Sequence, residues 1–476
     1  MNTRQLTLIA RREITELWRD GRLLIAGGLV AALMTAALLV NWQHQQAVDG
    51  ERRAAQTLDY DDWLKQSDRH PHNAAHQGLH VFKPAPPLAI IDPGITPFTG
   101  STIWLQAHRQ SESRFRPAQD ATGLQRFGSL SVAWVLQVLG PLLVIILGFN
   151  VFAGEREQGT LRQSLSLGVS GRTLLWGKAL ALIAVLALLL LPLAGASIAA
   201  VVHAAMQTAT QTADAGSLTS TAARLALLGA GYALYLGIAV FTVLAVSALA
   251  PTSRVALVTL LGLWIAGVML APRAASDAAR HLFPSPSRVE FSSALNANLD
   301  TAYTKAWSEQ LGTGKRWGGD VPLSRWGRAL QVDDQAGYAV SDTHFGRLWD
   351  SYEQQQRAQE WAGLLAPVLA LRALSMTAAG SGFHDHRAFS VAAETHRRLM
   401  QDIISDDLVK HADARGEAHF SYKAGAALWA KIPRFAHHPP GARDALRRTG
   451  ASLAALLAGL AMALCLAVWA ATSRAE

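Results

Sequence analysis

SLSVAWVLQVLGPLLVIILGFNVF, which spans residues 129–152, contains no charged side chain. A helix needs about 20 apolar residues to cross the roughly 30 Å hydrocarbon core of a bilayer. Inside that core, only helices and closed barrels satisfy the backbone N–H and C=O groups. This stretch therefore predicts a transmembrane helix.

Five other apolar blocks pass the same test. They cover residues 23–42, 173–203, 222–249, 253–271 and 449–472. The first block is longer than the apolar core of a signal peptide, about 7 to 15 residues, and no clear small-residue cleavage site follows it. We therefore interpret it as a membrane span and predict an all-α membrane protein with six transmembrane helices.

The polar residues form two large regions, 43–128 and 272–448, and a short loop, 204–221. Only 16% of the 476 residues are charged, whereas soluble domains have about 25%. The net charge of +8 does not indicate nucleic-acid binding, because the basic residues form no stripe interleaved with aromatic side chains. The single cysteine, Cys465, excludes a disulfide within the chain. Helical apolar patterns over residues 344–352 and 391–409 predict that the outer regions are mostly helical.

Arginine and lysine set the predicted orientation, because positively charged short flanks stay in the cytoplasm. Five arginines precede the first block, and the connection 153–172 is also basic, whereas the loop 204–221 has no lysine or arginine. We therefore expect both chain ends in the cytoplasm and both large polar regions outside it. Three arginines disagree, but they end a long region, where the rule has little force: Arg443, Arg447 and Arg448.

Residues 1–22 have the pattern of an amphipathic helix. Leu6, Ile9 and Leu17 fall on one side of this helix, and arginines fall on the other. Such a helix is expected to lie on the inner surface of the membrane.

The cytoplasmic connection 153–172 carries the most informative motif. It reads AGEREQGTLRQSLSLGVSGR, and Gly177-Lys178 follows as the chain returns to the membrane. Physically, the pattern favours a small helix parallel to the membrane that presents Glu155, Arg156 and Glu157 to water or to a partner. The alternative interpretation is an ordinary solvated helix cap.

On these residues the chain resembles the ABC-2-type permease family, in which Glu-Arg-Glu, Gly-Thr-Leu, Arg and Gly-Lys follow the second transmembrane helix. The likeness covers the six-helix plan, the N-terminal helix and this motif. With its large polar regions, the chain is similar to the branch that has large extracytoplasmic insertions. The resemblance implies a coupling helix within 153–172 that docks on an ATPase subunit through Glu155, Arg156, Glu157, Gly159, Thr160, Leu161, Arg162 and Leu165.

The resemblance also implies a function: the permease subunit of an ATP-driven transporter, an exporter or periplasmic-delivery system in a bacterial inner membrane. The sequence has no G-x-x-x-x-G-K-[ST] loop, so ATP and magnesium are expected on a partner ATPase and no cofactor on this chain. The expected assembly has two ATPase subunits and a second permease chain, identical or related, with a periplasmic or outer-membrane protein as a further partner. No catalytic residue is predicted. Two alternatives share this topology: a membrane-tethered periplasmic enzyme and a signalling protein that does not transport.

Histidines cluster in HPHNAAHQGLH, residues 70–80. If this segment is helical, His72, His76 and His80 share one face at i, i+4 spacing, which suits zinc or copper. Pro71 and Gly78 interrupt the run, so a surface or packing role is the alternative to a metal site.

Overall fold

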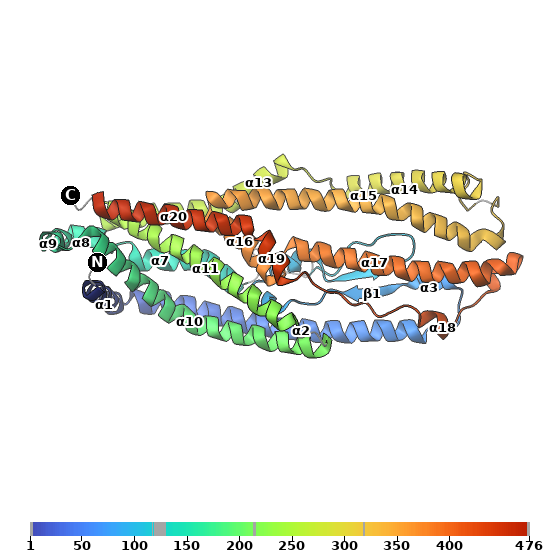
Figure 1. The fold of residues 1–476 in the computed structure, drawn as a ribbon, viewed down its shortest axis with the longest axis horizontal. Coiled ribbons are helices and arrows are strands. Elements are labelled where there is room, and N and C mark those ends of the chain that lie inside the picture. Colours follow the sequence, from blue (N-terminus) through green and yellow to red (C-terminus); the bar gives the residue numbers. More distant parts are fainter. Residues whose placement is uncertain (1–2, 117, 119–129, 213–215, 318, 474–476) are drawn as a thin grey trace.

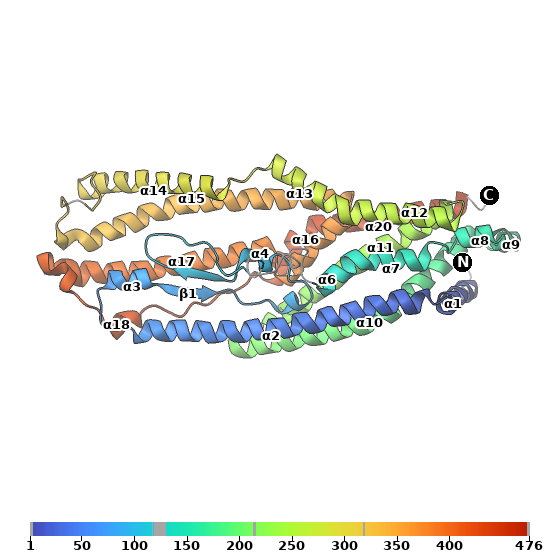
Figure 2. The same cartoon turned by 180° about the vertical axis from the view of Figure 1, so that it is seen from behind.

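The computed structural model describes residues 3–116, 118, 130–212, 216–317 and 319–473. It is about 80% helical and elongated (Figure 1). One end of the molecule holds the N-terminal helix, two short helices and the end of the last helix: α1 (Thr3–Arg19), α8 (Ala153–Glu157), α9 (Thr160–Ser166) and α20 (Gly450–Ser473). The polar regions form the opposite end (Figure 2).

Within the described residues, six helical stretches are long and apolar enough to cross a membrane, which confirms the predicted class. They are Leu23–Lys65, Val132–Glu157, Gly171–Gln207, Leu218–Leu249, Ser253–Leu282 and Gly450–Ser473. The first comprises η1 (Leu23–Gly27) and α2 (Gly28–Lys65), and the second comprises α6 (Val132–Trp134), η4 (Val135–Leu139), α7 (Gly140–Gly148) and α8. The others are α10 (Gly171–Thr212), α11 (Gly216–Leu249), the run α12 (Ser253–Trp264), η5 (Ile265–Leu270) and α13 (Ala271–Leu282), and α20.

Several of these helices extend well beyond the apolar blocks. The 42 residues of α10 extend for about 63 Å at about 1.5 Å per residue, twice the hydrocarbon core. The predicted loop 204–221 is accordingly helical, apart from residues 213–215, which lie outside the described residues, as does residue 129 at the start of the second predicted span. An apolar block ends where lipid ends, but a helix continues in water when tertiary contacts support it.

The second polar region is helical, as its sequence pattern predicts. Three long helices dominate it: α14 (Arg288–Leu311), α15 (Trp326–Trp361) and α17 (Phe383–Asp407). Shorter elements complete it: η6 (Leu323–Arg325), η7 (Ala362–Leu364), α16 (Pro367–Ala379), η8 (Leu408–Ala412), η9 (Asp413–Ser421), α18 (Ala426–Trp429) and α19 (Ala442–Arg448).

The first polar region contains a small sheet as well as helices, which its sequence did not predict. After α3 (Pro71–Gln77), the strands β1 (Leu79–Phe82) and β2 (Thr102–Leu105) pair antiparallel. Between them lie η2 (Pro87–Ile90) and α4 (Thr96–Thr99). Gly78, with φ of +64°, ends α3 in a conformation that glycine adopts without strain, and the chain can therefore turn into β1.

Two large hydrophobic clusters hold the described residues together. One lies among the membrane helices and extends to η2 and α16. The other lies in the polar regions, where Trp63 of α2, Phe389 of α17 and Trp429 of α18 are fully buried. The indole N–H of Trp63 donates to the carbonyl of Trp429 at 3.1 Å, so the far end of α2 is fixed to the last part of the second polar region.

Helix α16 joins the two ends of the molecule. It packs against α11 and α20, and its Val368, Ala370 and Leu371 are almost fully buried. A Cβ added to Gly231 of α11 would lie 2.6 Å from a methyl carbon of Leu374. The close approach of α11 and α16 therefore depends on a glycine.

Candidate functional site

The Gly177-Lys178 pair of the motif forms the junction between α10 and α1. Ile9 of α1 lies directly over Gly177, where an added Cβ would come within 2.6 Å of the isoleucine side chain. The next residue, Lys178, is only 1% exposed. Its ammonium pairs with Glu13 of α1 and lies 3.1 Å from Glu155 of α8, and it donates to the carbonyl of Val151 at 2.9 Å. One lysine therefore ties three segments together.

Arg156 connects the same short helix to the end of α11. Its guanidinium donates to the carbonyl oxygens of Ala248 and Ala250, each at 2.6 Å. The last carbonyls of a helix have no partner inside the helix, so Arg156 caps α11. The neighbouring Glu157 accepts a hydrogen bond from Ser253 Oγ, at the start of α12, at 2.6 Å.

These contacts bear on the predicted role of the motif. The Glu155 side chain is only 11% exposed and Arg156 is half-buried, whereas Glu157 is exposed. The predicted contact of these three residues with an ATPase stays a prediction. The two inward residues join α8 to α1, α10 and α11. Three charged residues after an apolar block do not show, from the sequence alone, which carbonyl groups and lysines lie beside them in the folded protein.

The exposed face of this connection lies on α9. Gly159, with φ of +76°, separates α8 from α9. Thr160 donates to the carbonyl of Glu155 at 3.2 Å, while Leu161 is buried and Leu165 packs against the membrane core. The opposite face is exposed and comprises Arg162, Gln163, Ser166 and Leu167, the last of which is 84% exposed. We call this set, together with Glu157, the α9 face.

A buried polar network lies where the membrane helices meet the polar regions, and the sequence did not indicate it. Asp92, which follows η2, accepts a hydrogen bond from Ser375 of α16. Ser375 also lies 3.1 Å from Tyr232 Oη of α11, which accepts from Gln137 Nε2 at 3.0 Å. Arg372 donates to the same glutamine at 3.3 Å. The network joins four segments that are distant in the sequence, which is why no local motif reveals it.

The histidines of residues 70–80 divide into two environments. His72 and His76 lie on α3 with their Nε2 atoms 3.0 Å apart. His80 lies on β1, where its Nδ1 is 2.8 Å from Asp59 and its ring stacks on Trp104. The predicted trio of His72, His76 and His80 is therefore not brought together, because the helix ends at Gln77.

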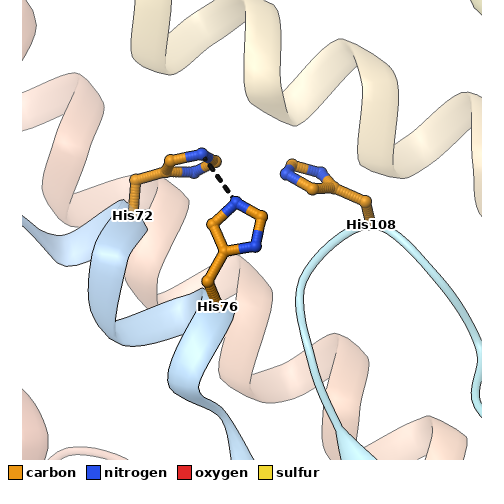
Figure 3. A group of neighbouring side chains, drawn as sticks. All are labelled: His72, His76 and His108. Atoms are coloured by element: carbon orange, nitrogen blue, oxygen red, sulfur yellow. Dashed lines mark hydrogen bonds between the residues drawn. The ribbon is translucent and has the colours of Figure 1, made fainter.

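A third histidine, His108, takes the place predicted for His80 (Figure 3). It follows β2, and one ring nitrogen from each of His72, His76 and His108 lies within 4.8 Å of the others. The backbone N–H of Ala107 donates to the carbonyl of Ala75 in α3 at 3.0 Å, which holds the loop against the helix. Burial and the neighbouring imidazoles lower the pKa of His72 to about 3.

A cavity of about 630 Å³ adjoins these histidines. His72 and His108 line it together with residues of α14 and α15, among them Asp300, Tyr303 and Asp333. Asp333, at the start of α15, forms an ion pair with Arg316 at 2.5 Å. The neighbouring Asp334 is buried and lies 3.7 Å from His108 Nδ1.

The six helical stretches of the described residues that are long and apolar enough to cross a membrane define a multi-pass membrane protein. A family model described as ABC-2 family transporter protein matches residues 7–394. The chain therefore belongs to the ABC-2 transporter family, as the motif indicated, and is a membrane permease, the transport subunit of an ABC transporter. Membership of this family implies an ABC ATPase partner. No curated protein matches the chain.

Proposed function

We propose that this chain is the permease subunit of an ATP-driven exporter in a bacterial inner membrane, and that a separate ABC ATPase docks on the α9 face. The family membership supports the transporter class. The observation that carries the docking proposal is the combination of an exposed α9 with a firmly bonded α8. The first offers a surface to a partner, and the second connects that surface to the membrane helices.

The α9 face has the chemistry of a small docking surface. Leu167 supplies an exposed apolar side chain, and the exposed Arg162 and Glu157 supply opposite charges. An apolar anchor surrounded by polar groups is typical of protein interfaces. Its buried side, with Leu161 and Leu165, keeps α9 attached to the membrane core when a partner pulls or pushes on it.

Force applied to α9 would pass through α8 to three other helices. Glu155 pairs with Lys178 of α10, which in turn pairs with Glu13 of α1, and Arg156 holds the end of α11. Closure of two ATPase subunits would therefore shift these helices as a rigid group, which is a common way to transmit a switch. Access to a pathway between this chain and a second permease chain, identical or related, would change with that shift.

The docking proposal is tested by charge reversal on the exposed face. Arg162→Glu combined with Leu167→Asp is expected to abolish copurification of the ABC ATPase and its permease-dependent ATP hydrolysis, because both changes place negative charge where the partner sits. The matched control is Arg11→Glu on α1, an exposed arginine at the same end of the molecule. ATPase binding that is equal in the double variant and the control would refute docking on α9.

Membrane insertion must be intact for this comparison. Both variants change only exposed side chains, so each is expected to yield a monodisperse detergent-solubilised protein with an unchanged melting temperature. Loss of the ATPase from both variants would indicate a general effect of charge at this end of the molecule instead of a specific docking surface. Absence of any ABC ATPase from the purified wild-type protein would favour a signalling protein or tethered enzyme.

A further inference from the structure

Three histidines converge at the edge of the cavity from segments that the sequence separates. His72 and His76 are one helical turn apart on α3, and His108 comes from the loop after β2 (Figure 3). Imidazole nitrogens are the usual protein ligands for zinc and copper, and three such ligands with an open fourth position form a common site.

The spacing of the nitrogens is close to that of a metal site. Zinc–nitrogen bonds of about 2.0–2.1 Å in a tetrahedron place two ligand atoms about 3.3 Å apart. His72 and His76 have their Nε2 atoms 3.0 Å apart, and the nitrogen of His108 lies within 4.8 Å of both. To reach this spacing, no pair of these nitrogens has to approach by more than about 1.5 Å.

The backbone at His108 provides an independent observation. Its φ is +65°, in the left-handed region that residues other than glycine seldom occupy. Such a conformation is strained for a residue other than glycine, and it persists where the surroundings fix it, often at functional sites. Here the hydrogen bond from Ala107 to Ala75 fixes the loop, and the result is that the His108 ring faces α3.

A buried carboxylate lies close to the ring of His108. Asp334 Oδ1 is 3.7 Å from His108 Nδ1 and has no hydrogen-bond partner among the described residues. Histidine ligands usually donate their second ring N–H to a carboxylate or carbonyl, which orients the ring toward the metal. A slight approach of Asp334 would make this bond and would also offset the charge of a cation.

We propose that His72, His76 and His108 bind one zinc ion or a chemically similar divalent transition-metal ion in the first polar region. Asp334 is a positioning residue that orients His108. The fourth coordination position faces the cavity of about 630 Å³, where it is accessible to water or to a ligand. This site is independent of the α9 face, because it lies at the other end of the molecule (Figure 1).

Metal titration of the full-length protein tests the proposal. The protein carries an affinity tag without histidine, is stripped with a chelator in detergent, and is titrated with ZnCl₂ by calorimetry, with metal content measured by mass spectrometry. One zinc ion per chain is expected. His108→Ala and His76→Ala should each weaken binding more than about 100-fold, and Asp334→Asn by about 10- to 100-fold. Magnesium and calcium should not compete, because they prefer oxygen ligands.

His80→Ala is the matched control, because His80 lies on the neighbouring strand and is paired with Asp59. It should bind zinc as the wild type does. Cobalt substituted for zinc gives a visible absorption band that reports tetrahedral coordination, and this band should disappear in His108→Gln even if the variant retains its melting temperature. Unchanged zinc affinity in His108→Ala, or no binding by the wild type, would overturn the proposal, and the 3.0 Å contact would then be a simple hydrogen bond between two histidines.

Discussion

Lys178 is a charged side chain buried where α1, α8 and α10 meet, and two carboxylates compensate its charge. Glu13 and Glu155 lie on either side of it, and Arg12 lies 4.0 Å from Glu155. Burial raises the pKa of Glu13, so this carboxyl group holds its proton more readily than an exposed one. Lys178, Glu13 and Glu155 stabilise the fold only together, because removing one partner leaves an uncompensated buried charge.

Lys178→Met is therefore expected to destabilise the protein by about 3–5 kcal/mol, because two buried carboxylates lose their common partner. A lower melting temperature and faster proteolysis after α1, near Arg19, would show it. Adding Glu13→Gln and Glu155→Gln to Lys178→Met should recover much of the lost stability, since the unpaired charges are then gone. A Lys178→Met protein as stable as the wild type would contradict the role of this ion pair.

His386, near the start of α17, makes the stability of the second polar region depend on pH. Burial lowers its pKa to about 3, and Lys83 and Arg116, which face it, act in the same direction. Its Nδ1 is buried without a hydrogen-bond partner in the part of the chain that the structure describes. In the unfolded chain the pKa is about 6.5, so below that pH the unfolded state binds a proton that the folded state does not.

The contribution of His386 to the free energy of unfolding should therefore be complete above about pH 6.5 and should decrease as the pH drops from there toward 3. Between pH 7.5 and 5.5, this single residue accounts for about 1 kcal/mol. Melting temperatures of the wild type and His386→Asn, measured at both pH values, are expected to show a smaller acid-induced decrease in the variant. Identical decreases in the two proteins would mean that His386 is protonated in the folded state.

The two short helices after the second span, α8 and α9, differ in what their side chains contact. Glu155 and Arg156 of α8 make contacts inside the protein, whereas the outer face of α9 is exposed. A helix of five residues such as α8 has little stability of its own, so its position depends on the bonds made by Glu155 and Arg156. Docking and transmission are therefore separable by mutation.

Arg156→Ala should leave ATPase copurification intact but reduce permease-dependent ATP hydrolysis, because the ATPase still binds α9 while the end of α11 loses its cap. Each unsatisfied carbonyl costs about 1–3 kcal/mol, so a lower melting temperature is also expected. Gln158→Ala is the control, because Gln158 directly follows the same helix and is exposed. Loss of ATPase binding in Arg156→Ala would place the docking surface on α8.

At the scale of the whole molecule, α16 couples the membrane helices to the polar regions. Gly231→Ala is expected to destabilise the protein by about 1–3 kcal/mol, because the new methyl group overlaps the buried Leu374. Gly229→Ala is the matched control on the same helix, as nothing lies within 4 Å of its added Cβ. In a Leu374→Ala background, Gly231→Ala should cost less than it does in the wild type, because the overlapping methyl groups are absent. Equal melting temperatures for the two glycine variants would exclude this close packing.

The orientation of the molecule is a prediction from its arginines and lysines. In a Cys465→Ser background, a cysteine at Gln163 of α9 should react with a membrane-impermeant reagent only after the membrane is opened. A cysteine at the exposed Asp402 of α17 should react in intact spheroplasts. The opposite pattern would place α9 outside the cytoplasm, where no ATPase could reach it.

The membrane class, the number of candidate spans and the family could be predicted from the amino-acid sequence, because apolar block length and the motif after the second span are local properties of the chain. The sequence also predicted the helices of the second polar region, whose apolar residues recur with helical spacing. The full lengths of α2 and α10 were not predictable in this way, since their far halves are polar and are held by distant partners such as Trp429.

The inward-facing residues of the motif and the histidines that come together could not be predicted from the sequence, because distant segments of the fold place them. Glu155 and Arg156 turn inward because Lys178 and the end of α11 lie beside them, and neither is near in the sequence. His108 replaces His80 because the pairing of β1 with β2 folds the chain back onto α3. Contacts between distant segments depend on the path of the whole chain, which no local spacing of residues specifies.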